Sequence, residues 1–130
     1  MANAYKVLGQ TGDAFTTAVD IYTASGVEAI VSTVVVCNRS AAAKTFDISV
    51  RPAGATEANE HYIAKGTTIA ANDSITLTAG ITLADTDVIT VTASTADVSF
   101  SVFGIEISEE NKCLLVQSAS LVLTVNKINL

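Results

Sequence analysis

A chain of 130 residues, of which 49% are hydrophobic and 15% charged, has the size and composition of one compact domain. This composition excludes a solvated, disordered chain. A net charge of -6 argues against binding to the phosphate backbone of a nucleic acid. No stretch approaches the about eighteen apolar residues of a membrane span, and the first residues lack the features of a signal peptide.

Near the start of the chain, Gly9 to Gly12 reads Gly-Gln-Thr-Gly. It lacks the lysine and the serine or threonine of a phosphate-binding loop, so a plain turn is predicted. Further on, Val27 to Cys37 is apolar at both odd and even positions. Val31, Val35 and Cys37 would face one side and Ile30, Val34 and Val36 the other. This pattern predicts a strand that is central or covered on both faces.

The middle of the chain alternates between apolar and polar residues with a period of two. The alternation runs through residues 45–51, again through residues 74–83, and through Ile89 to Thr92. This period is typical of antiparallel strands with one dry and one wet face. The predicted core comprises Phe46, Ile48, Val50, Leu77, Ile81, Ile89 and Phe100.

The stretch from Val98 to Ile107 changes its parity. Val98, Phe100 and Val102 are even-numbered, whereas Phe103, Ile105 and Ile107 are odd-numbered, with Gly104 between them. The change predicts a β-bulge or bend at Gly104.

Asparagine, aspartate and glycine residues, which are typical of turns, lie between these runs. Helical periodicity is nowhere sustained. The pattern predicts an all-β protein, an antiparallel β-sandwich of about eight strands, of jelly-roll or immunoglobulin-like type. We expect residues 1–107 to form the sandwich and residues 108–130 to add a C-terminal strand or arm.

The C-terminal run from Cys113 to Val125 is again apolar at both parities. An exposed strand of this kind is a template for aggregation, so it must be covered by the protein's own sheet or by a neighbour. It is either the last strand of the sandwich or an arm between subunits. The second reading makes these residues candidate interface residues: Leu114, Leu115, Val116, Leu121, Val122 and Leu123.

Residues that could carry chemistry are few. His61 is the one histidine, and no Gly-x-Ser-x-Gly frames a nucleophile, so we expect an exposed or interface histidine and no catalytic residues. Asp73, Asp85 and Asp87 could supply oxygen ligands to calcium, but without a full loop signature they are expected to form turns. No metal site and no cofactor is predicted.

The two cysteines, Cys37 and Cys113, each lie within an apolar run, far apart in the sequence. Neither has a Cys-x-x-Cys partner or a nearby histidine. Both are therefore expected to be buried, reduced thiols rather than a disulfide or metal ligands.

Six stretches of the chain together carry a resemblance: Tyr5 to Gln10, Val31 to Arg39, Val50 to Ala55, His61 to Ala64, Ile69 to Ala84 and Asp87 to Val91. They resemble a family of small virion structural proteins of tailed bacteriophages, of the cyanophage and marine phage type. The similarity runs from about Tyr5 to Ile107, and the segment after Ser108 departs from it.

The resemblance implies a non-enzymatic virion protein that cements or decorates the capsid as a homo-oligomer, with a trimer as the expected state. Its partners would be the major capsid protein or tail components, and it would bind neither nucleic acid nor membrane. A role in the tail, neck, baseplate or a fibre is the alternative. A carbohydrate-binding module is an alternative of another class, although a chain with no Trp and three Tyr offers few stacking platforms.

Overall fold

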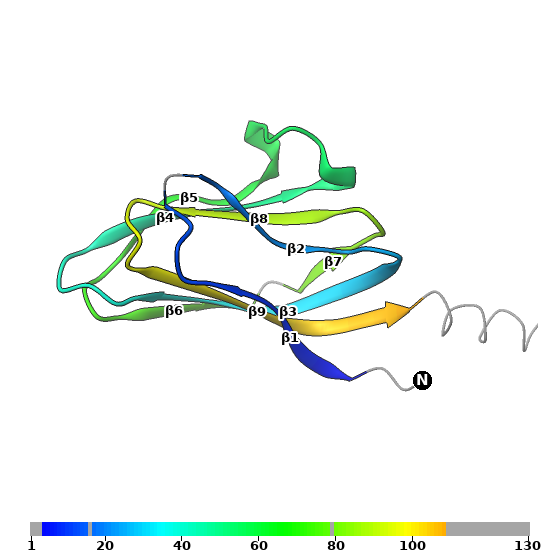
Figure 1. Ribbon diagram of the computed structural model, residues 1–130, viewed down its shortest axis with the longest axis horizontal. Helices are drawn as coiled ribbons and strands as arrows, with labels where there is room; N and C mark the ends of the chain where they lie inside the picture. The colour runs from blue at the N-terminus through cyan, green and yellow to red at the C-terminus, as the bar shows by residue number, and fades with distance from the viewer. Residues whose placement is uncertain (1–3, 16, 79, 109–130) are drawn as a thin grey trace, which may run out of the picture.

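The computed structural model describes residues 4–15, 17–78 and 80–108. These residues form nine strands and two short 3-10 turns, arranged as two layers (Figure 1). The strands are β1 (Tyr5–Thr11), β2 (Val19–Thr23), β3 (Val27–Asn38), β4 (Lys44–Arg51), β5 (Tyr62–Ile69), β6 (Ser74–Leu77), β7 (Ile81–Leu83), β8 (Val88–Ala93) and β9 (Val98–Ser108). The turns are η1 (Pro52–Gly54) and η2 (Asn59–His61).

The strands pair in a nested order. One sheet, called here sheet A, has the order β1-β9-β3-β6, with β7 also pairing with β3; the other, sheet B, has the order β2-β8-β4-β5. All pairs are antiparallel. If β6 and β7 count as one interrupted strand, the first strand pairs with the last, the second with the next to last, and so inward. This is jelly-roll topology, so the predicted β-sandwich is confirmed and the immunoglobulin-like alternative is not the one adopted.

The core between the sheets comes from the alternation seen in the sequence. Phe46, Ile48, Ile89 and Phe100 of the predicted core are fully buried. The other three predicted core residues, Val50, Leu77 and Ile81, are half-buried and pack against the cluster from its margins. The predicted long strand over residues 74–83 is interrupted at Gly80, whose φ of 59° is a left-handed conformation that favours glycine.

Strand β3 is central, as predicted, but its side chains do not divide as the sequence suggested. An extra residue, Ser32, interrupts the register between Val31 and Thr33 opposite β9. Before this bulge the odd residue Val31 faces the core, and after it the even residues Val34 and Val36 do. The bulge therefore shifts the inward parity within one strand.

The sequence predicted a bulge or bend in the chain at Gly104. The structure has its irregularities beside Gly104, in the two strands that flank β9, and not in β9 itself. Strand β9 keeps its even residues, from Val98 to Gly104, directed inward throughout. The extra residues belong to its two neighbours, Ser32 in β3 and Leu8 in β1. Phe103 and Ile105 therefore lie on the outer face of sheet A. The change from even to odd apolar positions is thus a change from the core face to the outer face of a regular strand.

Candidate functional site

His61 is the last residue of the η2 turn, and its side chain forms a hydrogen bond with the backbone of that turn. Its Nδ1 accepts a hydrogen bond from the Ala58 amide at 3.0 Å, and its own amide donates to the Ala58 carbonyl at 3.0 Å. The imidazole is half-buried. Its contacts stabilise the loop between β4 and β5.

The three aspartates singled out in the sequence hold turns, which confirms the turn-forming interpretation. Asp87 accepts hydrogen bonds from the amides of Ala53 and Ala84, at 2.8 and 2.9 Å. Asp85 accepts one from Gly26, and Asp73 one from Ser74. Within the described ranges, no group of three or more His, Cys, Asp or Glu residues is placed to hold a metal ion.

The segment predicted as a plain turn at Gly9 to Gly12 is instead mostly strand, because β1 extends to Thr11. Pairing with β9 draws it into the sheet. A pocket of about 310 Å³ lies beside it, lined by Gln10, Thr11, Gly12, Ser99, Phe100 and Ser101. Phe100 is buried in the core, so the described lining of this pocket presents no aromatic face on which a sugar ring could stack.

Cys37 is half-buried, which corrects the prediction of a fully buried thiol. The Ser32 bulge directs it to the outer face of sheet A, between Ser74 and Ser99 of the flanking strands. Cys113 lies outside the described residues.

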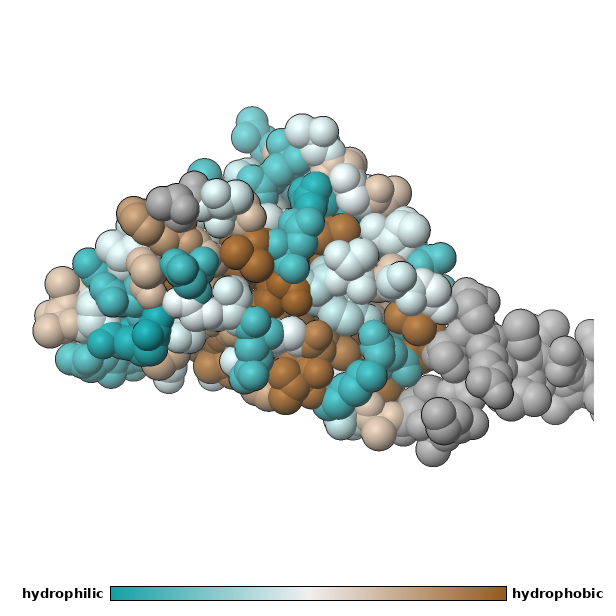
Figure 2. Space-filling view, in the orientation of Figure 1, coloured by the Kyte–Doolittle hydropathy of each residue, from teal (hydrophilic) through white to brown (hydrophobic). Residues whose placement is uncertain are grey.

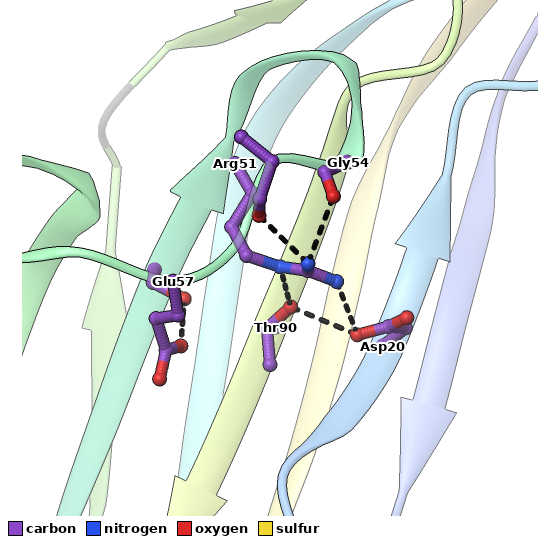
Figure 3. A network of polar contacts seen from close by, with 7 residues as sticks. Asp20, Arg51, Gly54, Glu57 and Thr90 are labelled. Atoms are coloured by element: carbon purple, nitrogen blue, oxygen red, sulfur yellow. Dashed lines mark hydrogen bonds and ion pairs between the residues drawn. The ribbon is translucent and has the colours of Figure 1, made fainter.

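The outer face of sheet B carries a polar network around Arg51, at the end of β4 (Figure 3). The guanidinium donates to the Thr90 hydroxyl and to Asp20 Oδ1, each at 2.9 Å, and to the carbonyls of Gly54 and Ala55. The Thr90 hydroxyl also donates to Asp20. The Arg51 guanidinium, on β4, thus connects β2, β8 and the η1 loop.

A second polar cluster lies beside it over β4 and β5. The hydroxyls of Ser49 and Tyr62 both donate to the Glu57 carboxylate, and Ser49 is fully buried. The hydrogen bond to Glu57 raises the pKa of Tyr62 above its ordinary value. Lys65 pairs with Asp47, which raises the pKa of the Lys65 amine, and it lies over the Tyr62 ring.

Each of the two clusters makes its hydrogen bonds among its own members. Among the described residues, every buried side-chain nitrogen or oxygen has a hydrogen-bond partner. The buried polar atoms of this face are therefore already engaged inside the subunit.

The outer face of sheet A is different near the start of β1. Five apolar side chains gather there on three adjacent strands, and we call them the β1–β9 face: Tyr5, Val7, Ile30, Phe103 and Ile105. Tyr5 is 75% exposed, Val7 50% and Ile30 38%. Figure 2 shows hydrophobic surface along the lower edge of the molecule, over the first part of β1.

The register explains how this face is assembled. Tyr5 and Ile30 both stand opposite Ile105, one on each side, and Val7 stands opposite Phe103. Sequence reasoning missed this surface, although the order Tyr5, Lys6, Val7 carries a period of two. The signal was too short to show that the apolar positions face solvent.

The candidate interface residues Leu114, Leu115, Val116, Leu121, Val122 and Leu123 lie outside the described residues. Over the described part of the chain, no helix is long and apolar enough to cross a membrane.

Comparison with known proteins gives no relative. No family model, no curated protein and no solved structure matches the chain.

Proposed function

We propose that this protein is a non-enzymatic structural protein of a bacteriophage virion, acting through protein–protein contacts as a cement or decoration protein of the capsid. The observation that carries the proposal is the contrast between the two outer faces. Sheet B is polar and internally satisfied around Arg51 and Glu57, whereas sheet A exposes the apolar β1–β9 face.

A contiguous apolar surface that is exposed on a domain with few charges favours association with another protein surface over a monomeric state. Burial of a fully exposed Val, Ile or Phe side chain contributes roughly 1.5 to 3 kcal/mol. The β1–β9 face is thus suited to a stable, repeated contact such as a particle surface offers.

The jelly-roll fold is compatible with the proposal but does not decide it. Jelly rolls recur in viral capsid proteins and in lectins, so the topology alone favours neither a particle protein nor a sugar-binding protein. The resemblance to phage virion proteins favours the first. In that role the chain would be a homo-oligomer, with a trimer as the proposed state, and its partner would be the major capsid protein. A tail, neck, baseplate or fibre position would use the same kind of contact.

Purified particles of the phage that encodes this chain provide the test. Mass spectrometry should detect the protein in the particles, and a cryo-electron map should show density of its size at symmetric positions on the capsid. Density on the tail instead would contradict a capsid decoration role and support the alternative role in the tail. Absence of the protein from purified particles would overturn the virion role.

A further inference from the structure

The β1–β9 face lies at an open margin of sheet A. Among the described strands, β1 pairs with β9 alone. After the Leu8 bulge, β1 approaches β2 so closely that Gly9 lies against the Ile21 carbonyl, which closes that part of the sandwich. Residues Tyr5 to Val7 precede the bulge, so they keep both an exposed apolar face and a free strand edge.

The same chain contains a segment of complementary character. Residues 113–125 are apolar at both parities, and a link of only four residues, 109–112, separates them from the end of β9 at Ser108. The five steps of extended chain from Ser108 to Cys113 reach at most about 18 Å. The apolar run therefore begins close to the end of the strand that forms the middle of the β1–β9 face.

A second copy can use both features more readily than the subunit itself. Both edges of β9 are already paired, with β1 and with β3, and β9 continues past Ile105, the partner of Tyr5, to Ser108. To reach the free β1 edge of its own subunit, the run would have to reverse its direction and cross β1 within the four-residue link. A second copy placed in the path of the chain offers the same free edge and the same apolar face without that reversal.

We infer that residues 113–125 of one copy dock on the β1–β9 face of a second copy, and that this contact holds the homo-oligomer together. The inference deepens the proposed function and takes from it the premise that the chain assembles with itself. The contact joins two different surfaces, so it closes into a ring when each copy serves the next. A trimer closed in this way would use every apolar run and every face once.

Point variants of the full chain test the contact. The face variant is Val7→Lys with Ile30→Lys, which places charges where the structure shows exposed apolar side chains. The run variant is Leu115→Lys with Leu121→Lys. The matched control is Ile63→Lys on β5, because Ile63 is 47% exposed and so resembles Val7 at 50%, but lies in the other sheet. Circular dichroism melting confirms that each variant is folded, and light scattering after size exclusion gives its mass.

We expect the natural chain and the control to have the same oligomeric mass, and the face and run variants each to fall to the monomer mass. The face variant keeps an intact run and the run variant keeps an intact face. Mixed in equal amounts, they should therefore form a species of twice the monomer mass that neither forms alone.

Three results would overturn the inference. A face variant that assembles like the natural chain would place the interface elsewhere. Monomeric face and run variants that form no mixed species would exclude the exchange of runs between copies. A natural chain that is itself monomeric would mean that no second copy covers the face. All three are measured on the isolated protein, so they are distinct from its absence from phage particles, which would overturn the virion role alone.

Discussion

The Tyr22 hydroxyl donates a hydrogen bond to Glu106 Oε2 at 2.6 Å and so links the two sheets, since Tyr22 lies on β2 and Glu106 on β9. Burial raises the pKa of Tyr22, and the hydrogen bond to Glu106 raises it further, so the phenol stays protonated as a donor. Lys6 on β1 forms an ion pair with the same carboxylate. One acidic side chain thus ties together three strands of the sandwich.

Replacement of Tyr22 by Phe should remove this link and keep the packed ring. We expect the free energy of unfolding to fall by about 1.5 kcal/mol, the low end for a hydrogen bond to a charged acceptor, because the Glu106 side chain is partly exposed to water. Urea denaturation measures the change. Tyr5→Phe is the matched control, because Tyr5 is 75% exposed, and it should change stability by less than about 0.5 kcal/mol. Equal effects of the two changes would contradict a bridging role for Tyr22.

Glu106 should make the fold sensitive to acid. The hydrogen bonds from Lys6 and Tyr22 hold the pKa of Glu106 below its ordinary value of 4.5. A depressed folded-state pKa contributes stability above the unfolded value, and this contribution is lost as the pH falls through the folded value. The natural protein should therefore lose stability below pH 4.5 more steeply than Glu106→Gln. Melting temperatures measured from pH 6 down to about pH 3 test this, with Glu60→Gln at an exposed position of η2 as the control. Parallel curves for all three proteins would refute it.

Phe46 and Phe100 join the sheets at the centre of the core. Their ring centroids are 6.1 Å apart with an interplanar angle of 74°, an edge-to-face contact between β4 and β9. Replacement of either by Ala should cost about 3 to 5 kcal/mol. A double-mutant cycle with Phe→Leu at both positions should give a coupling energy of about 0.5 to 1.5 kcal/mol in urea denaturation. Strictly additive effects would mean that the two rings act independently.

Cys37 should react with a thiol reagent in the folded protein. Its side chain is half-buried on the outer face of sheet A, so access is slowed but not blocked. Mass spectrometry after brief labelling, with and without denaturant, should show modification at Cys37 under both conditions and a faster rate in denaturant. Cys37→Ser identifies the site. Labelling of Cys37 only after unfolding would contradict this description.

Gly9 and Gly12 should respond in opposite ways to the same change. A Cβ atom at Gly9 would lie 2.1 Å from the Ile21 carbonyl oxygen, whereas at Gly12 the nearest atoms are 3.8 Å away. Gly9→Ala should therefore destabilise the fold by about 1 to 3 kcal/mol through overpacking. Gly12→Ala should be neutral or stabilising by about 0.4 to 1 kcal/mol, because alanine restricts the unfolded chain. Thermal melting of both variants tests this, and equal losses would show that the approach of β1 to β2 is not tight.

The sandwich and the centre of its core could be predicted from the sequence, because residues such as Phe46, Ile48 and Ile89 alternate with polar residues within a single strand. The bulges at Leu8 and Ser32 could not be predicted. A bulge depends on which strand lies alongside. Both bulges lie beside Phe103, which pairs with Val7 and with Thr33 and is about 95 and about 70 positions away from them. The same dependence hid the β1–β9 face, since Tyr5, Ile30 and Ile105 become neighbours only through long-range pairing.

Strand β9 pairs with both β1 and β3, yet it is the last described strand to be synthesised. Strand β1 therefore emerges from the ribosome with its hydrogen-bonding partner still untranslated, and sheet A gains β9 only after the other eight described strands have been made. At about 5 to 20 residues per second, β1 and β3 spend several seconds with exposed edges. Pairing over such sequence separations belongs to the slow-folding class of domains. We therefore expect the nascent chain to need protection from aggregation until β9 is made.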